Sequence, residues 1–350
     1  MTAPAAKPGR LRKIAVEEAV SIPEVARELL KVCRSPAGSS SDLNLLRLIY
    51  DAPADRPQVG FLDGLLDMEN RRLAEMDQYG VDMQVLSLTS PGVQMFDADT
   101  ACELATVAND RLAEVIARHP TRFAGLASFA PQSPKRAVKE MERAIRQLKF
   151  NGLIVNSHTN NEYLDDPKYW PILEAAEALD SVLYIHPRGA SDGLKGPVSD
   201  YGIEAAMWGY GVETGTHMVR LMASGVFDRF PKLRICVGHM GEAVPFWIWR
   251  INFMNGRNQT TGRSPRTSLT MAEYLQRNFL ITTSGVEDPL ALEYTVRKLG
   301  ADNVMWAIDY PYQPTAPAVA FMDNVTLSPE DKAKVAYRNA ERVFRIAPAA

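Results

Sequence analysis

The amino-acid sequence predicts an α/β protein folded as one (β/α)8 TIM barrel. Eight short apolar runs alternate with helical segments over nearly all of the 350 residues. No clear break in composition marks a domain boundary, and no G-x-G-x-x-G turn of a dinucleotide-binding sheet follows the first run. The alternation favours a parallel sheet, and eight repeats in a chain of this length favour its closure into a barrel. An open, doubly wound sheet is the alternative.

Strands are expected where short apolar runs end at polar or turn-forming residues. In chain order they are Lys13 to Val16, Met83 to Leu88, Phe123 to Phe129, Gly152 to Val155, Val182 to Ile185, Leu233 to Val237, Phe279 to Thr282 and Val304 to Ile308. The sixth run shows the pattern, because it ends at Gly238, presents His239 and continues into an amphipathic segment. Such a unit places polar side chains at the carboxyl end of a parallel strand.

Helices are expected between these strands, where apolar residues recur at helical spacing. They are Ile22 to Val32, Gly64 to Tyr79, Asp97 to Arg118, Ser133 to Leu148, Pro167 to Leu179, Glu213 to Ser224, Ala243 to Arg250, Met271 to Asn278, Pro289 to Leu299 and Ser328 to Phe344. Gly80, Pro120 and Gly225 follow three of these segments and mark their ends.

Residues 13–346 are expected to form a single barrel domain after a disordered tail of residues 1–12, which has no apolar signal core. An insertion at about residues 33–59, after the first βα unit, is rich in turn-forming residues. Long stretches of this kind in compact domains are usually functional covers or disordered segments. We expect either a lid over the functional site or a decoration of the surface.

Composition narrows the classes of partner. The net charge is -3 and the basic residues form no long run, which argues against nucleic acid. No apolar run approaches the roughly 20 residues that span a bilayer, which argues against a membrane protein. Cys33, Cys102 and Cys236 form no C-x-x-C pair, so a zinc knuckle or disulfide framework is not expected. These features suit a cytoplasmic protein.

Polar residues follow most of the expected strands, and in a barrel all these strand ends meet at one mouth. They are Glu17, Ser87, Thr89, His158, His186, His239, Thr283, Ser284 and Asp309. Two carboxylates and one imidazole, from Glu17, Asp309 and His186, would form an oxygen-rich site for one divalent ion, Zn²⁺ or Mn²⁺. The alternatives are a solvated charge at Glu17, a packed His186 and an Asp309 that caps a turn.

The remaining polar residues have two interpretations each. Glu242 could orient His239 as an acid, a base or a substrate-binding group, or the two could simply pack together. His158 at the mouth is either a substrate contact or an ordinary loop residue, and Ser87 is a further candidate contact. His217, inside a helix, is expected to be a packing or second-layer residue.

Arg72 and Arg250 stand on expected helices, where a surface charge is the default interpretation. A guanidinium can bind a carboxylate with two parallel hydrogen bonds. Both arginines therefore become candidate binding residues if the substrate is a small carboxylate.

The strand-end motifs taken together resemble those of a known family. V-E-E-A, L-Y-I-H-P-R, V-G-H-M-G-E with W-R-I downstream, I-T-T-S-G and A-I-D-Y-P-Y resemble the metal-dependent decarboxylase branch of the amidohydrolase superfamily. That branch includes γ-resorcylate, 2,3-dihydroxybenzoate and 5-carboxyvanillate decarboxylases and aminocarboxymuconate semialdehyde decarboxylase. The resemblance runs from about Lys13 to Phe344, and only the motifs in combination are specific.

The resemblance implies a role for each matching residue. It places the metal ligands at Glu17, His186 and Asp309, the catalytic histidine at His239 and its orienting carboxylate at Glu242. It places the substrate-binding arginines at Arg72 and Arg250, one of which can reach across from a neighbouring subunit in the family. It therefore implies a homodimer or homotetramer.

Ala19 is the one clear departure from the family pattern. Many members read E-x-H at the first strand, whereas this chain has alanine at the third position, as the carboxyvanillate decarboxylase branch does. The loss of an imidazole favours a harder ion, so Mn²⁺ is favoured over Zn²⁺. The absence of H-x-H at this strand also argues against amide hydrolysis by a doubly ligated metal.

The expected reaction is non-oxidative decarboxylation of an aromatic carboxylic acid, with a hydroxyl ortho to the carboxylate. The resemblance implies that Asp309 donates the proton to the ring carbon. The alternative on the same barrel is a metal-dependent hydrolase or hydratase of a lactone, a carbon-carbon bond or a related small carboxylate. A barrel that has lost catalysis and acts as a binding scaffold is the third interpretation.

Overall fold

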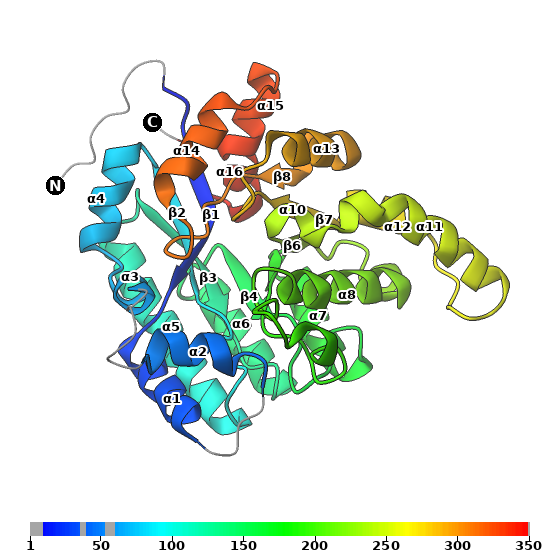
Figure 1. The fold of residues 1–350 in the computed structure, drawn as a ribbon, viewed down its shortest axis with the longest axis horizontal. Helices are drawn as coiled ribbons and strands as arrows, with labels where there is room; N and C mark the ends of the chain where they lie inside the picture. The colour runs from blue at the N-terminus through cyan, green and yellow to red at the C-terminus, as the bar shows by residue number, and fades with distance from the viewer. Residues whose placement is uncertain (1–9, 36–39, 53–59, 349–350) are drawn as a thin grey trace.

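The computed structural model describes residues 10–35, 40–52 and 60–348. Within them, eight parallel strands form one sheet in the order β1 to β8 (Figure 1). They are β1 (Ile14–Val20), β2 (Met83–Leu88), β3 (Phe123–Ser128), β4 (Gly152–Asn156), β5 (Leu183–His186), β6 (Ile235–Val237), β7 (Phe279–Thr282) and β8 (Val304–Met305). The predicted (β/α)8 barrel is confirmed.

The chain after β8 closes the barrel against β1. The backbone N–H of Ala19 donates to the carbonyl of Tyr310 at 2.8 Å, and the N–H of Asp309 donates to the carbonyl of Glu17 at 3.1 Å. Both bonds lie at the carboxyl ends of the strands. The closure therefore brings Glu17 and Asp309, which are 292 positions apart in the sequence, next to each other.

Apolar side chains fill two layers. Alternate residues of all eight strands point inward and pack together, among them Ile14, Met83 and Tyr184. The opposite faces of the strands pack against the surrounding helices in a larger cluster. Phe344 and Ile346, near the end of the chain, pack against the inner cluster. A barrel filled in this way is a solid core, so any reaction must take place at its rim.

The helices surround the barrel (Figure 1). They are α1 (Pro23–Arg34), α2 (Leu43–Tyr50), α3 (Phe61–Leu66), α4 (Asn70–Tyr79), α5 (Ala98–Arg118), α6 (Pro134–Arg146), α7 (Trp170–Ala178), α8 (Gly209–Ala223), α9 (Val226–Arg229), α10 (His239–Glu242), α11 (Val244–Thr260), α12 (Met271–Asn278), α13 (Pro289–Leu299), α14 (Thr315–Asn324), α15 (Pro329–Ala333) and α16 (Asn339–Phe344). Short 3-10 turns stand at Pro167–Tyr169, Gly196–Val198 and Ala301–Asn303, and a π turn at Lys334–Arg338.

Three helix predictions need correction. The expected helix Ala243 to Arg250 continues to Thr260 as α11. The expected helix Gly64 to Tyr79 is two helices, because the backbone leaves the helical region at Asp67 and Glu69, between α3 and α4. The expected helix Ser328 to Phe344 is interrupted by the π turn. Helix α14 was not predicted, although its face with Ala318 and Met322 is buried.

The described part of the predicted insertion, 33–59, is more ordered than its composition suggests. It contains the end of α1 and the whole of α2, whose Leu46, Ile49 and Tyr50 are buried. Residues 36–39 and 53–59 lie outside the described residues, so the lid stays a prediction. Most of the predicted tail also lies outside them, but Arg10 and Arg12 form ion pairs with the barrel and are not disordered.

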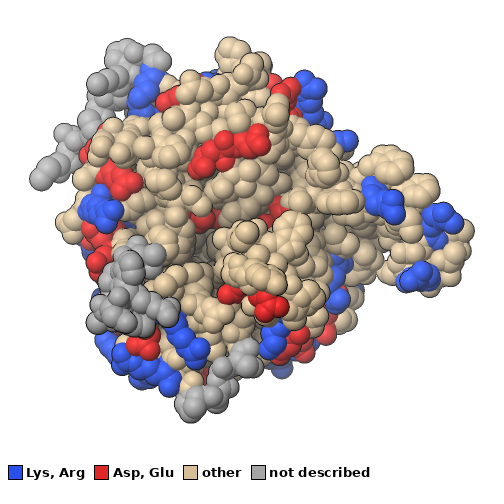
Figure 2. All heavy atoms as spheres, in the orientation of Figure 1, with Lys and Arg blue, Asp and Glu red and all other residues tan. Residues whose placement is uncertain are grey.

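Helix α11 and the turn after it project from the barrel (Figure 1). The segment from Ala243 to Ala272 contains four arginines and no acidic residue. On the visible face, acidic and basic side chains are interspersed over the barrel, whereas the projecting arm shows basic side chains (Figure 2). None of the described helices is long and apolar enough to cross a membrane.

Candidate metal centre and active site

A β-bulge in β1 turns Glu17 into the mouth of the barrel. Between Ala15 and Glu18 the register with β2 shifts, so that β1 holds one more residue than β2 over this stretch. A bulge of this kind lets two successive residues share one face. Glu17 therefore points inward, while Glu18 points outward into the layer below the helices.

The two carboxylate oxygens of Glu17 have different surroundings. Oε2 accepts hydrogen bonds from the hydroxyls of Tyr184, Thr282 and Ser284. Oε1 is buried and has no hydrogen-bond partner among the described residues. A buried carboxylate oxygen without a donor is costly, so its position calls for a cation.

Two imidazoles face this oxygen. His186 Nε2 lies 3.3 Å and His239 Nε2 3.6 Å from Glu17 Oε1. Burial alone would raise the pKa of Glu17, but the charge of His239 and the contact with His186 lower it well below its ordinary value. Glu17 is thus an anion at neutral pH, which suits a carboxylate that faces a cation.

His186 is the last residue of β5, and its tautomer follows from its contacts. Nδ1 lies 2.7 Å from the backbone carbonyl of Pro187, which accepts but cannot donate a hydrogen bond. Nδ1 therefore carries the proton, and in the neutral ring Nε2 keeps a lone pair directed toward Glu17. A second contact that fixes the tautomer in this way is typical of metal-binding histidines.

His239 and Glu242 are brought together by an unusual left-handed turn. All five residues from His239 to Ala243 have φ between 51° and 74°. This conformation costs about 1–2 kcal/mol at each residue other than glycine, and such strain clusters at functional sites. At Gly241, whose φ is 74°, a Cβ would stand 2.9 Å from Ile281, so a side chain there would be strained. The turn places His239 Nδ1 2.7 Å from Glu242 Oε1.

His239 is surrounded by negative charge. Its Nε2 also lies 3.9 Å from Asp309 Oδ2. Burial lowers the pKa of His239, but Glu242 and Glu17 raise it well above its ordinary value overall. These carboxylates favour the doubly protonated ring, which suits a group that donates hydrogen bonds or protons.

Asp309 follows β8, and Glu18 fixes the backbone on both sides of it. The outward Glu18 carboxylate accepts hydrogen bonds from the N–H groups of Ile308 at 3.0 Å and Tyr310 at 3.3 Å. Asp309 itself has a φ of 73°. Burial raises its pKa, and the nearby Glu17 adds to this, against the opposing effect of His239.

The described residues fit a divalent ion. One oxygen of Glu17, one nitrogen of His239 and one oxygen of Asp309 lie within 4.8 Å of one another. His186 is not part of that three-residue group, although it is close to Glu17. At Gly238 a Cβ would stand 2.5 Å from Glu17 Oε2, so the glycine makes room for the carboxylate. Nitrogen and carboxylate donors of this kind suit Mn²⁺ or Zn²⁺.

Two predicted substrate contacts lie near this mouth. Ser87 is on β2 opposite Ala19 of β1 and is buried. His158 is also buried, but both of its ring nitrogens contact the backbone, Nε2 the carbonyl of Gly189 at 3.0 Å and Nδ1 the N–H of Asn161 at 3.3 Å. The structure therefore gives His158 a role in holding the loop after β4.

Arg72 does not lie at the mouth, which corrects its predicted role as a substrate contact. Its side chain is 1% exposed on α4, in the layer between barrel and helices. The guanidinium donates to Gln84 Oε1 at 3.0 Å and to the carbonyl of Ala19 at 2.7 Å. It lies over the ring of Tyr310, close to the charge of Glu18. Arg72 lies in this layer because Glu18 of β1 and Gln84 of β2 point outward from the barrel.

Arg250 lies on the projecting helix α11 and is exposed. No hydrogen bond or ion pair of its side chain is found within the described part of the chain. Its role as a substrate contact stays a prediction.

Sequence analysis missed two tyrosines at the mouth. The hydroxyl of Tyr312 lies 2.7 Å from Thr89 Oγ1, and Tyr210 and Tyr312 are both close enough to Asp309 to feel its charge. Tyr312 follows Asp309 by three residues in the D-Y-P-Y motif, which was the available signal. Nothing in the sequence around Tyr210 connects it with the site.

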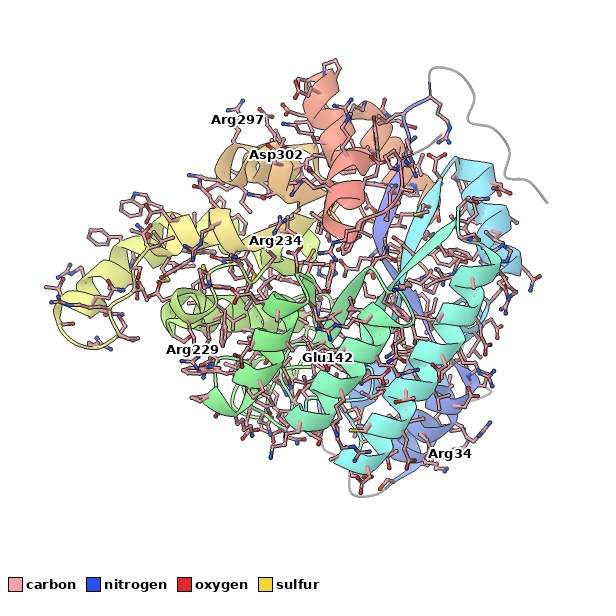
Figure 3. All side chains as sticks on the ribbon, turned by 180° about the vertical axis from the view of Figure 1, so that it is seen from behind. Arg34, Glu142, Arg229, Arg234, Arg297 and Asp302 are labelled. Carbon is pink, nitrogen blue, oxygen red and sulfur yellow. The ribbon has the colours of Figure 1, made fainter. Side chains whose placement is uncertain are left out.

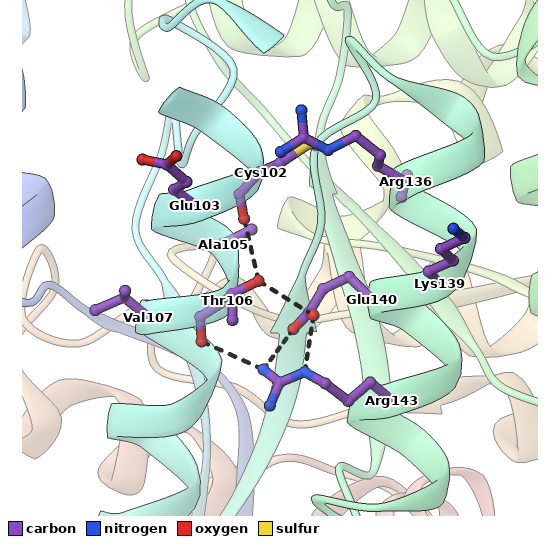
Figure 4. Close-up of a pocket in the computed structure, with 11 residues that line it drawn as sticks. Cys102, Glu103, Ala105, Thr106, Val107, Arg136, Lys139, Glu140 and Arg143 are labelled. Carbon is purple, nitrogen blue, oxygen red and sulfur yellow. Dashed lines mark hydrogen bonds and ion pairs between the residues drawn. The ribbon is translucent and has the colours of Figure 1, made fainter. Parts of the chain in front are cut away.

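A separate cavity lies away from the mouth. A cavity of about 590 Å³ opens between α5 and α6, on the outside of the barrel (Figure 4). Its two arginines are paired with carboxylates, since Arg143 contacts Glu140 and Asp110, and Arg136 contacts Asp99. It is a groove between neighbouring helices on the outside of the barrel.

Comparison with known proteins agrees with this geometry. The amidohydrolase family profile matches residues 49–346. A γ-resorcylate decarboxylase from a Polaromonas species is 36% identical over 293 residues, which cover 81% of this chain and 89% of that protein.

Two solved structures are similar over almost their whole length. The 5-carboxyvanillate decarboxylase from Sphingomonas paucimobilis is 52% identical, with a TM-score of 0.94 and coverage of 97% of this chain and 100% of that one. The 5-carboxyvanillate decarboxylase from Novosphingobium aromaticivorans is 39% identical, with a TM-score of 0.92 and coverage of 95% and 96%. It was solved with manganese and 4-hydroxy-3-methoxy-5-nitrobenzoic acid.

Proposed function

This chain belongs to the amidohydrolase family and is a carboxy-lyase, and we propose that it is a metal-dependent, non-oxidative decarboxylase of an ortho-hydroxy aromatic acid. The observation that carries the proposal is the donorless, buried Glu17 Oε1 at the mouth of the barrel. His186, His239 and Asp309 surround this oxygen with the charges and lone pairs that a divalent ion and an anionic substrate require.

We propose 5-carboxyvanillate as the first substrate to test. The decarboxylases of this compound match the chain over nearly its whole length. The ligand bound in one of them carries a nitro group next to a ring hydroxyl, at the position that bears the carboxylate in 5-carboxyvanillate. Ala19, which this sequence shares with the carboxyvanillate decarboxylase branch, also favours 5-carboxyvanillate as the substrate.

Glu17, His186 and Asp309 would hold the ion, and Mn²⁺ is favoured because the relative with an aromatic ligand contains manganese. When bound, the ion supplies Lewis-acid stabilisation of the negative charge on the substrate oxygens and holds the ring in place. The family resemblance assigns His186 as the ligand and His239 as the group that binds substrate, and the contact of His186 Nδ1 with the carbonyl of Pro187 leaves Nε2 directed toward Glu17. Burial lowers the pKa of both rings, but nearby carboxylates raise it overall, for His239 well above its ordinary value.

Asp309 would donate the proton that allows CO₂ to leave. Its proton forms a bond to the ring carbon that bears the carboxylate. The bond from this carbon to the carboxylate then breaks, its electron pair returns to the ring, and CO₂ is released. Burial raises the pKa of Asp309, which favours its protonated form, and Glu18 holds the backbone on both sides of it. His239, oriented by Glu242, would bind a substrate oxygen.

The test is an assay for released CO₂ with a panel of hydroxybenzoates, 5-carboxyvanillate and γ-resorcylate included, on Mn²⁺-loaded protein. We expect turnover of one or more of these acids by the native chain. Asp309→Asn should lower kcat by at least about 10²-fold, the low end of the usual contribution of a proton donor. The carboxamide keeps a metal-binding oxygen, so the variant should retain its metal. Near-normal turnover in Asp309→Asn would rule out this mechanism.

We also propose that the chain forms a homodimer or homotetramer through α11. Four large aromatic side chains on this helix are exposed: Phe246 (68%), Trp247 (56%), Trp249 (70%) and Phe253 (49%). A contiguous apolar surface of this kind usually marks a protein interface. Arg250 lies among them, so a second copy seated on this helix would receive its guanidinium.

A further inference from the structure

A second, smaller cavity lies at the opposite end of the barrel from the mouth. It has a volume of about 90 Å³ and opens at the amino-terminal ends of β5 and β6. Ser181 precedes β5 by two residues, and Arg234 directly precedes β6. Figure 3 shows Arg234 from this rear side of the molecule. The charged side chains that line the cavity are Lys232, Arg234, Arg342, Arg345 and one carboxylate, Asp180.

The positive charge of this cavity is not balanced by the protein. The single carboxylate, Asp180, is taken by Arg345. Among the described residues, Arg342 donates only to neutral oxygens, the carbonyl of Asp302 and the side chain of Asn339. Arg234 is half-buried, and within the described residues its guanidinium has no hydrogen bond and no ion pair.

Burial and the charge of Arg342 lower the pKa of Arg234. The two guanidinium groups therefore repel each other in a site that shields them partly from water. An anion between them would remove this repulsion. The cavity between α5 and α6 gives the contrast, since each of its arginines already has a carboxylate partner.

Ser181 gives an independent indication of a ligand. Its side chain is only 8% exposed, and its hydroxyl has no hydrogen-bond partner among the described residues. Buried hydroxyls are nearly always paired, because they lose their bonds to water without compensation. Ser181 belongs to the wall of the same cavity as Arg234, so two side chains that have no acceptor among the described residues line one cavity.

We propose that this cavity binds an oxyanion of the phosphate type, with Arg234, Arg342 and Ser181 as hydrogen-bond donors. A guanidinium matches the oxygens of such an anion with two parallel bonds, and the serine hydroxyl supplies a further donor. The small volume suits a single anionic group. Free phosphate and the phosphate group of a small monoester offer the same chemistry.

The first test is the thermal unfolding of Mn²⁺-loaded protein in increasing inorganic phosphate, against sodium chloride at equal ionic strength. Phosphate should raise the Tm of the native chain by a few degrees in a saturable manner, because a ligand that binds only the folded state stabilises it. Arg234→Gln and the exposed Arg342→Gln should each weaken phosphate binding at least about tenfold.

Arg297→Gln is the matched control. Arg297 is an exposed arginine on the same rear view, outside the cavity, and the variant changes the net charge by the same amount (Figure 3). It should respond to phosphate as the native chain does. An equal response in Arg234→Gln and Arg342→Gln would overturn the proposal, because phosphate would then act elsewhere, for example at the metal centre.

Calorimetric titration separates the two sources of the anion. Inorganic phosphate and glycerol 2-phosphate are titrated into the native chain and into Ser181→Ala, whose small change leaves the barrel packing intact. Weaker binding of either compound to Ser181→Ala than to the native chain supports the site. The compound that binds the native chain more tightly identifies the source of the anion. Absence of binding by both would refute it.

Discussion

At the scale of single residues, position in the strand decides function. Glu17 and Glu18 are neighbours of the same type, yet the bulge in β1 sends one to the mouth and the other into the wall. Glu17 faces two imidazoles, whereas Glu18 binds the backbone N–H groups around Asp309. One carboxylate is placed to hold an ion, and the other positions a residue of the same site.

The assignment of His186 as a ligand and of His239 as a substrate-handling group predicts opposite metal contents for two variants. His186→Gln should lose bound Mn²⁺, because it removes a directed lone pair. His239→Gln should keep the metal but lower kcat by about 10²–10⁴-fold, the usual contribution of an acid-base group. Metal content by elemental analysis and turnover are measured on both proteins. Loss of metal only in His239→Gln would instead make His239 the ligand, as its place in the three-residue group allows.

The sequence predicted the strand-end residues well, because an apolar run followed by a polar residue has one meaning in a parallel barrel. It could not predict that Arg72 is confined to the wall. That placement depends on the outward direction of Gln84 and Glu18, and hence on a bulge that no residue pattern announces. Tyr210 was missed because it reaches the mouth only through the packing of α8.

At the scale of elements, the sequence predicted the exact ends of an element where capping or helix-ending residues flank it. Helix α13 begins at Pro289, directly after the capping residue Asp288, and ends at Leu299, directly before Gly300. Strand β8 is shorter than its apolar run, because Trp306 leaves the ladder and bonds to Val335 in the π turn. Such a departure depends on a segment 29 positions away and leaves no local signal.

Helix α8 is tied to the loop after β4 by a buried histidine, which predicts a pH dependence of stability. His217 is fully buried, and its Nε2 accepts the N–H of Leu164 at 3.1 Å. Burial, followed by the charges of His158 and Arg220, lowers its pKa to about 3. The folded chain therefore keeps His217 neutral, whereas the unfolded chain takes up a proton below about pH 6.5.

Since the unfolded state binds the extra proton, this contribution to stability is complete above pH 6.5 and is lost progressively as the pH falls toward 3. His217→Gln removes the titration and keeps an acceptor. Between pH 6.5 and 5.5 its free energy of unfolding in urea should fall less steeply than that of the native chain, by up to about 1.4 kcal/mol per pH unit. At pH 7.5 to 8.5 the two slopes should coincide. Equal slopes in the acidic range would mean that His217 is charged in the fold.

At the scale of the whole molecule, the barrel separates two chemically different ends. The mouth gathers carboxylates and imidazoles from β1, β5, β6 and β8, which suits a cation and an aromatic acid. The opposite end gathers arginines around Ser181 without matching carboxylates, which suits an anion. The projecting arm carries an exposed aromatic surface, which is the interface that we propose for a second copy.

The arm leads to a prediction about assembly and activity together. Trp249 stacks on Phe253 with their ring planes 4° apart, and both are exposed, so they form a flat apolar surface. Trp249→Glu would place a charge in the proposed interface. We expect light scattering to show a smaller particle than the native oligomer, with the barrel still folded by circular dichroism. Because the helix also carries Arg250, turnover should fall with the assembly.

Arg250→Gln separates the two effects, since it leaves the aromatic surface in place. It should keep the native oligomer but raise KM or lower kcat for the aromatic acid, because a guanidinium partner of a carboxylate is lost. Leu290→Glu, a charge placed at a 74% exposed residue of α13, is the control for a surface change off α11. A native chain that is monomeric at micromolar concentration and fully active would contradict this role of α11, and Arg250 would then be an ordinary surface charge.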